Sequence, residues 1–413
     1  MPPKHKRYAR AMLAWLPSLF FFAVLMGSPV PGFLVFMLIG IAHAWQSWRQ
    51  PHSANAFQWT RQDTWLALCF MSIPLFKLLT LLWSADAKLA LGNVAWHLYF
   101  LFWPLVLMGL SQCQSTQTTV DRALALGLIA TAIWRSAFQI TEWPWLNPGT
   151  VNLGILAQLI MTVGAWNMLA LTRSNPGSSS GWRGIHALAL IATVVLLVLT
   201  TRRLELLGFA LIAATMLAWR ARSSLTPLRL LVGSVVFLGL LALLVYLRWD
   251  KFALGFEQIA QYRVHGAQTE NFTVNSWGIR LELWRVSLAA FLDHPWLGLG
   301  ASARPFDMQA WGAPPAELFN HRHFHSHLMQ TLVEGGLLGM GVLLLTLGYS
   351  TWAMIVRPWK TRPEVALLGA ALLAAYVMEG TASATLQYDK ANALLVVMSC
   401  WIWLQIKKEN SAF

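Results

Sequence analysis

Apolar stretches of membrane-spanning length recur along the chain, each bounded by short polar or turn-forming segments. A bilayer core requires about 20 apolar residues per helix, and in lipid a helix satisfies its own backbone hydrogen bonds. The pattern therefore predicts an all-α, polytopic membrane protein with about twelve transmembrane helices. The predicted spans are Ala11–Met26, Gly32–Trp48, Thr64–Trp83, Ala90–Leu110, Arg122–Ile140, Val151–Leu171, Ile185–Thr200, Leu204–Trp219, Leu228–Leu247, Gln330–Val356, Val365–Ser383 and Ala391–Ile406.

Basic residues gather on one side of this predicted bundle. They precede the first span and follow the second, sixth, eighth, tenth and twelfth, whereas the short loops on the other side contain few. Because basic loops stay in the cytoplasm, both termini are expected to be cytoplasmic. The residues concerned are Lys4, Lys6, Arg7, Arg10, Arg49, Arg61, Arg173, Arg183, Arg220, Arg222, Arg229, Arg357, Lys360, Arg362, Lys407 and Lys408.

One connecting segment, Arg248 to Met329, is long and falls on the outer side. Long loops without secondary structure are unusual, so this segment is expected to form a small helical capping domain. Helices are predicted near Lys251–Arg263 and Ile279–Asp293, the second ending at the sequence DHPWLGLG. In the second helix, residues Leu281, Trp284, Leu288 and Phe291 follow helical spacing. The expected division is residues 1–247, 248–329 and 330–413.

The composition agrees with a membrane protein and narrows its function. Charged residues make up 11% of the chain, less than half of the roughly one quarter usual in soluble proteins. The net charge of +13 fits cytoplasmic loops and contact with anionic lipids, or alternatively an anionic substrate. A nucleic-acid partner is not expected in so apolar a chain. No Walker motif is visible, so chemistry on the outer side requires a substrate that is already activated.

Several cations lie where topology does not require them. Lys77 and Arg135 are within predicted spans; each either reaches the outer interface with its tip or has a function in the membrane. Two adjacent arginines lie in the outer turn LVLTTRRLELLG, where guanidinium groups suit a phosphate or diphosphate; Glu205 is the alternative partner. The remaining outer cations are Arg280, Lys88 and Lys390, and the adjacent arginines are Arg202 and Arg203.

Four histidines lie within the seven residues HRHFHSH, immediately before an apolar helix. A zinc site is one interpretation, but no convincing Asp, Glu or Cys accompanies the histidines, and the cationic surroundings oppose metal binding. The other interpretation is proton transfer by one histidine, with the rest placed at a polar helix start. The four are His321, His323, His325 and His327.

The segment HSHLMQTLVEGGLLG resembles the signature of the O-antigen ligase and O-antigen polymerase superfamily. The matching positions are His325, Ser326 (often Asn in the family), Leu332, Glu334, Gly336 and Gly339. The upstream segment GIRLELWRVSLAAFLDHPWLGLG resembles the preceding family segment. Its matching positions are Arg280, Trp284, Pro295, Gly298 and Gly300. LTTRRLELLGFAL is similar to the family's Ser-Arg-Gly turn, with Arg203 favoured over Arg202, and LLWSADAKLAL resembles an early outer loop.

The resemblance implies a GT-C-like glycosyltransferase in the bacterial inner membrane, with one large helical periplasmic loop. It would move a glycan from undecaprenyl diphosphate to a sugar hydroxyl of lipid A–core, with no cofactor, metal or ATP. Under this hypothesis His325 is the general base, and Arg203 and Arg280 hold the diphosphate, with Arg202 as substitute. Glu334 is structural or orients another part of the loop, while Gly336 and Gly339 allow close packing. His321, Arg322, His323 and His327 are candidates to line the acceptor site or to contact phosphates of the core.

Other functions remain open from the sequence. The polymerase of the same superfamily, or a relative that transfers glycans to protein Ser or Thr, would share the donor chemistry. Twelve spans, one dominant outer loop and many outer cations favour the ligase. A transporter or flippase belongs to a different class; it usually has paired halves or broken helices, and the sequence indicates neither.

Overall fold

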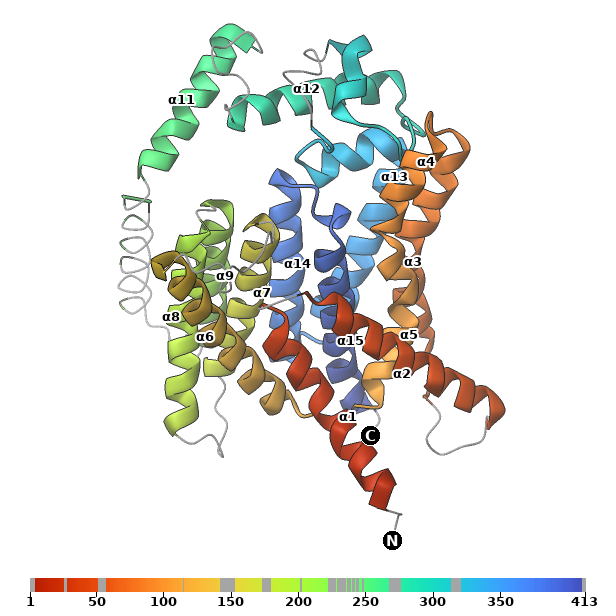
Figure 1. Ribbon diagram of the computed structural model, residues 1–413, viewed down its shortest axis with the longest axis vertical. Helices are drawn as coiled ribbons and strands as arrows, with labels where there is room; N and C mark the ends of the chain where they lie inside the picture. Colours follow the sequence, from red (N-terminus) through yellow and green to blue (C-terminus); the bar gives the residue numbers. More distant parts are fainter. Residues whose placement is uncertain are drawn as a thin grey trace.

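The computed structural model describes residues 4–25, 28–50, 57–113, 115–141, 153–172, 180–200, 203–221, 249–266, 276–312 and 321–410, together with single positions between 228 and 246. Within these residues every regular element is a helix. Figure 1 shows an upright helix bundle with further helices across one end. The predicted all-α membrane fold is confirmed at this level.

The bundle helices match the predicted spans closely. They are α1 (Lys4–Ala23), α2 (Val30–Arg49), α3 (Arg61–Leu79) with η1 (Thr80–Leu82), α4 (Ala87–Ala95), η2 (Leu98–Phe102), α5 (Trp103–Ser111), α6 (Gln117–Thr141), α7 (Leu153–Thr172), α8 (Ser180–Leu199), α9 (Arg203–Ala221), α13 (His327–Thr351) with η7 (Trp352–Val356), α14 (Pro363–Ala382), η8 (Thr385–Gln387) and α15 (Asp389–Asn410). The predicted span Leu228–Leu247 lies almost entirely outside the described residues.

Within the described residues, five helices are long and apolar enough to cross a membrane, or six if the bent pair Ala87–Ala95 and Leu98–Ser111 forms one span. Shorter apolar helices lie in α1, α7 and α9. The chain is therefore a multi-pass membrane protein, and the count of twelve spans stays a prediction.

Local sequence sets the start of α3. Thr60 and Asp63 form a capping box, in which the hydroxyl and the carboxylate each accept a hydrogen bond from the other residue's backbone N–H. The same carboxylate is buried, accepts from the Trp403 indole at 2.6 Å and pairs with Lys407 at 2.7 Å. These contacts join the beginning of α3 to the end of α15 beside a large apolar core.

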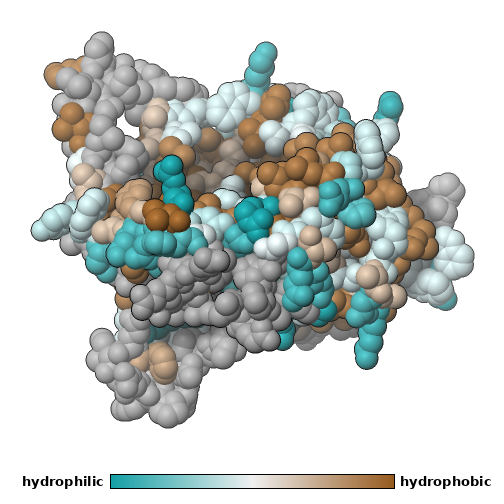
Figure 2. Space-filling view, turned by 90° about the horizontal axis from the view of Figure 1, so that it is seen from above, coloured by the Kyte–Doolittle hydropathy of each residue, from teal (hydrophilic) through white to brown (hydrophobic). Residues whose placement is uncertain are grey.

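Two helices lie over one end of the bundle, α11 (Trp249–His265) and α12 (Ser276–Asp293), as Figure 1 shows. They confirm the two helices predicted in the outer segment, and α12 ends at Asp293 before the predicted proline and glycine stop. Figure 2 shows this end from above, with hydrophilic side chains scattered among apolar ones.

The buried face of α12 differs from the predicted stripe. Leu283 and Val286 are buried, whereas Leu288 is exposed. Apolar residues occur on more than one side of this helix, so spacing alone did not identify the packed side. The core beneath the helix contains Ile279, Leu283, Val286, Ala290, Ala303, Met308, Phe324 and Val333.

Two helices that the sequence indicated as continuous are broken. The fourth predicted span, Ala90–Leu110, bends by 49° between Ala87–Ala95 and Leu98–Ser111. Helix α13 is interrupted at Gly336, where φ is 58° and ψ is −151°. The expectation of unbroken helices, which had counted against a transporter, is therefore wrong at two places, and the choice between enzyme and transporter rests on other evidence.

The break in α13 is closed by the segment that follows α12. A break frees backbone groups that must find partners inside a membrane protein. Here the backbone of Pro295–Gly300 supplies these hydrogen-bond partners. We call the pairing of Pro295–Gly300 with Val333–Leu338 the clasp. Its four hydrogen bonds run from Leu337 N to Pro295 O (2.7 Å), Leu338 N to Trp296 O (3.2 Å), Leu299 N to Val333 O (2.7 Å) and Gly300 N to Glu334 O (3.0 Å).

A third segment packs on the clasp, the stretch LLWSADAKLAL with its flanking residues. The Asn93 side chain donates to Ala301 O at 2.8 Å, and Ala301 N donates to the Thr80 hydroxyl at 3.2 Å. The Trp83 indole donates to Leu297 O at 3.1 Å. Three segments that are far apart in the chain therefore meet where α3 ends and in the first half of α13.

Candidate active site

The histidine-rich segment forms a tight turn that leads into α13. Ser326 is the N-cap of the helix, with extended backbone and a hydroxyl that accepts from Met329 N at 3.5 Å. The preceding Phe324 is fully buried in the core beneath α12. The turn is thus fixed at one end by helix capping and in its middle by apolar packing. We call residues 321–326 the histidine turn.

Three imidazole rings meet within the histidine turn. The His325 ring centroid lies 4.4 Å from that of His323 and 5.3 Å from that of His321, both in edge-to-face arrangements. His325 has a φ of 48°, the one positive value for a non-glycine residue in the described part of the chain. Such a conformation costs about 1–3 kcal/mol and persists where surrounding structure imposes it.

The His323 ring bridges the turn to the segment before α15. Its Nδ1 accepts from His325 N at 3.3 Å, which leaves Nε2 to donate to the Tyr388 hydroxyl at 3.1 Å. Burial lowers the pKa of His323 to about 4, with His321 as a smaller cause. Burial also lowers the pKa of His321. Both neighbours of His325 are therefore uncharged at neutral pH.

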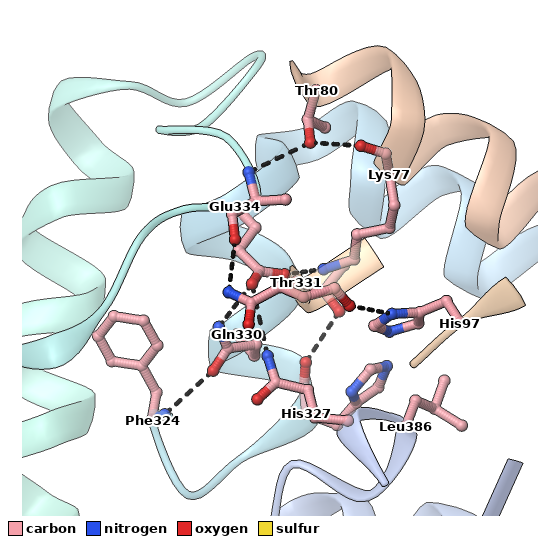
Figure 3. Close-up of polar contacts among 12 residues, drawn as sticks. Lys77, Thr80, His97, Phe324, His327, Gln330, Thr331, Glu334 and Leu386 are labelled. Carbon is pink, nitrogen blue, oxygen red and sulfur yellow. Dashed lines mark hydrogen bonds and ion pairs between the residues drawn. The ribbon is translucent and has the colours of Figure 1, made fainter. Parts of the chain in front are cut away.

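A buried ion pair lies under the histidine turn. Lys77 from α3 pairs with Glu334 from α13, and their side chains are 9% and 1% exposed. The Glu334 carboxylate also accepts from the side chains of Gln330 at 2.7 Å and Gln387 at 3.4 Å. The side-chain oxygen Oε1 of Gln330 in turn accepts from Phe324 N at 3.1 Å. A continuous polar chain thus runs from α3 to the backbone of the turn (Figure 3).

A small cavity of about 20 Å³ adjoins this ion pair. Figure 3 shows His97 and His327 on the same side of the cluster as Lys77. His97 Nε2 and His327 Nδ1 are both buried without a hydrogen-bond partner. Because the Lys77 side chain is buried beside this cavity and paired with Glu334, it does not extend to the membrane interface. Of the two interpretations that the sequence allowed for Lys77, a role inside the membrane remains.

Of the arginines predicted to bind substrate, the structure describes the side chains of Arg280 and Arg322. Arg280 lies on α12, half-buried, with its guanidinium carbon 5.4 Å from the Trp277 ring centroid. Arg203 begins α9, but its side chain is outside the described residues, as is all of Arg202. Arg322 is exposed in the histidine turn.

The other candidate cations are dispersed. Lys88 is exposed on α4, and Lys390 is partly buried in the first turn of α15. Arg135 lies on α6, which packs against α1, α7 and α8. The structure thus separates Arg135 from the histidine turn, while Lys77 joins it through Glu334.

A family model described as O-antigen ligase matches residues 188–345. The chain carries an O-antigen ligase family domain. The domain extends from α8 across the outer helices into α13, so it includes the clasp and the histidine turn. This match supports the predicted superfamily, O-antigen ligase and polymerase, whose members are glycosyltransferase-like membrane enzymes. No curated protein matches the chain.

The ion pair between Lys77 and Glu334 was not predicted from the sequence. The sequence predicts a structural or orienting role for Glu334 and indicates no partner for Lys77. A signal was present, because two opposite charges lay in two different apolar spans, and charges in membranes usually pair. Lys77 lies outside the matched domain, so the family residues depend on a helix from earlier in the chain.

Gly336 of the HSHLMQTLVEGGLLG motif has a role beyond the predicted close packing. Gly336 adopts a conformation open only to glycine, and a Cβ there would meet the Trp296 carbonyl carbon at 2.5 Å. Gly339 is in helical conformation beside the Phe76 ring. Among the described residues, no group of three His, Cys, Asp or Glu side chains is placed to hold a metal ion.

Proposed function

We propose that this protein is an O-antigen ligase, an inverting glycosyltransferase that acts without a metal. It moves a preassembled glycan from undecaprenyl diphosphate to a sugar hydroxyl of lipid A–core, on the periplasmic side of the inner membrane. The observation that carries this proposal is the strained, half-buried His325 between two uncharged histidines, inside a domain of the matching family. Strain of this kind concentrates at functional sites.

His325 is the proposed general base. The acceptor hydroxyl must lose its proton as it attacks the anomeric carbon, and an imidazole has a reference pKa of about 6.5, suited to that transfer. Its neutral neighbours do not repel the imidazolium that forms. The proton passes to His325, the bond from the anomeric carbon to the diphosphate oxygen breaks, and the configuration inverts.

Arg203 and Arg280 are proposed to stabilise the leaving diphosphate, with Arg202 as substitute for Arg203. The diphosphate gains negative charge as the sugar departs, and fixed guanidinium groups in a site shielded from water stabilise that charge. Arg280 lies on α12, whose core also holds Phe324 of the histidine turn. Removal of one such donor typically lowers the rate by about 10²–10³-fold. Arg322, His321, His323 and His327 are proposed to face the acceptor.

The test uses purified protein in lipid or detergent, with EDTA, undecaprenyl-diphosphate-linked glycan and lipid A–core. A glycan-sized mass gain on lipid A–core, lost in His325→Ala, is expected. His265→Ala is the matched control, because His265 is an exposed histidine of the outer helices. If His325→Ala transferred glycan at the wild-type rate, His325 would not be the general base.

The same assay distinguishes the related functions. Longer lipid-linked chains formed from donor alone would indicate an O-antigen polymerase, and glycan transferred to added protein would indicate the Ser or Thr transferase. None of these products, with a matching donor and a folded sample, would favour a transporter or flippase, which the two broken helices also allow.

A further inference from the structure

A cleft of about 640 Å³ opens beside the clasp, away from the small cavity under the histidine turn. Its walls come from the end of α3, the segment after α12 and the short helix η6 (Pro305–Trp311). Three tryptophans, Trp83, Trp296 and Trp311, line it together with Asp293 and Asp307. The proposed ligase chemistry uses none of these residues.

The tryptophans are held in defined positions around the cleft. The Trp311 indole donates to the Asp293 carboxylate at 2.5 Å, and the His294 ring packs edge-on against it at 6.2 Å between centroids. The Trp83 indole donates to the Leu297 carbonyl at 3.1 Å. Trp296, by contrast, is 67% exposed. Two walls are therefore fixed and one large indole face is open.

The charge of the cleft selects among ligands. Its described lining contains two aspartates and neither lysine nor arginine, in a chain with a net charge of +13. Asp307 pairs with Arg304, which is outside the lining, at 3.0 Å. Carboxylates repel diphosphate, core phosphates and anionic lipid head groups, but they accept strong hydrogen bonds from hydroxyl groups.

Sugar rings match this combination of surfaces. A pyranose has an apolar C–H face, which packs on an indole, and a rim of hydroxyl donors, which suit carboxylate acceptors. We propose that the cleft binds sugar residues of the donor glycan while its diphosphate lies at the arginines. This inference rests on the proposed function, because it takes the lipid-linked glycan as the substrate.

The clasp joins this cleft to the histidine turn. Leu299, which lines the cleft, donates its N–H to Val333 O at 2.7 Å, and Gly300 N donates to Glu334 O. Glu334 contacts Gln330, which holds the backbone of the turn. A glycan in the cleft is thus held against the same backbone that carries the histidine turn, so binding there adds affinity for the donor close to the proposed base.

The test measures glycan binding apart from transfer. The probe is the delipidated O-polysaccharide of the native strain, released by mild acid, with dextran of equal size as the negative control. Binding is followed by saturation-transfer NMR and titration on the full protein in nanodiscs. Trp296→Ala removes an exposed ring and leaves its clasp carbonyl in place, and Asp293→Asn gives an independent second variant. The matched control is Trp249→Ala, an indole of similar exposure on α11.

Trp296→Ala is expected to weaken polysaccharide binding by on the order of tenfold and to raise the donor KM with kcat nearly unchanged, whereas Trp249→Ala leaves both at wild-type values. Equal binding by wild type, Trp296→Ala and Asp293→Asn would overturn the cleft proposal, as would no binding by wild type. Wild-type binding without any glycan transfer would instead overturn the ligase function and leave the cleft as a glycan site.

Discussion

Lys77 of α3 and Glu334 of α13 form an ion pair that is almost completely buried, although the residues are far apart in the chain. Through Gln330, the carboxylate reaches Phe324 N, and Phe324 immediately precedes His325. An ion pair between two helices is therefore connected to the backbone that carries the proposed base. Isolated buried charges are costly, so each partner requires the other.

The first prediction concerns this pair. Lys77→Met leaves Glu334 buried without its counter-charge and is expected to destabilise the protein by about 3–5 kcal/mol. The double variant Lys77→Met/Glu334→Gln removes both charges and is expected to recover part of that loss. Thermal unfolding in one detergent compares them. A double variant no more stable than the single one would contradict the role of the ion pair.

The second prediction concerns the break in α13. Gly336→Ala places a Cβ against the Trp296 backbone at a φ of 58° and is expected to lower stability by at least about 1–3 kcal/mol. The control is Gly341→Ala in the same helix, where a Cβ would meet nothing within 4 Å. That control is expected to be neutral or slightly stabilising, by about 0.5–1 kcal/mol. Thermal unfolding of both variants tests this difference. Equal melting temperatures for the two variants would contradict the proposed need for glycine at position 336 in the clasp.

The third prediction concerns Gln330 as a positioning residue. Gln330→Leu removes the bonds to Glu334 and to Phe324 N, so the histidine turn loses its connection to the ion pair. Transfer kcat is expected to fall on the order of tenfold, with little change in donor KM, because misplacing a base affects the chemical step. Thr331→Val is the control, since the Thr331 hydroxyl bonds only the carbonyl of His327 within its own helix. Steady-state kinetics of the two variants would refute the prediction if both behaved alike.

The fourth prediction is a pH dependence from His323. Its folded-state pKa of about 4 lies below the unfolded value of about 6.5. Between these values the unfolded chain binds more protons, so the stability of the folded protein falls as the pH decreases from about 6.5 to 4, by up to about 3 kcal/mol. His323→Gln should flatten this slope. Melting temperatures across that pH range test it, and an unchanged slope in the variant would assign the dependence elsewhere.

The sequence by itself determined the class of this protein and most of its helices. Apolar length and spacing predicted the spans, the two outer helices and the end of α12 at Asp293, because these depend on local hydrophobicity and on proline and glycine. It also placed the histidine turn before α13 and indicated the family that the domain match supports. These properties are read from neighbouring residues, so no distant contact is needed.

Only the tertiary structure decided which distant residues meet. The partner of Lys77, the buried face of α12 and the break at Gly336 all depend on contacts between segments far apart in the chain. The Gly336 conformation is stable because Pro295 and Trp296 accept the hydrogen bonds that the break in the helix releases. Local pattern records the propensity of a segment, whereas a buried charge or an unpaired backbone group is satisfied only by a partner that the fold brings to it.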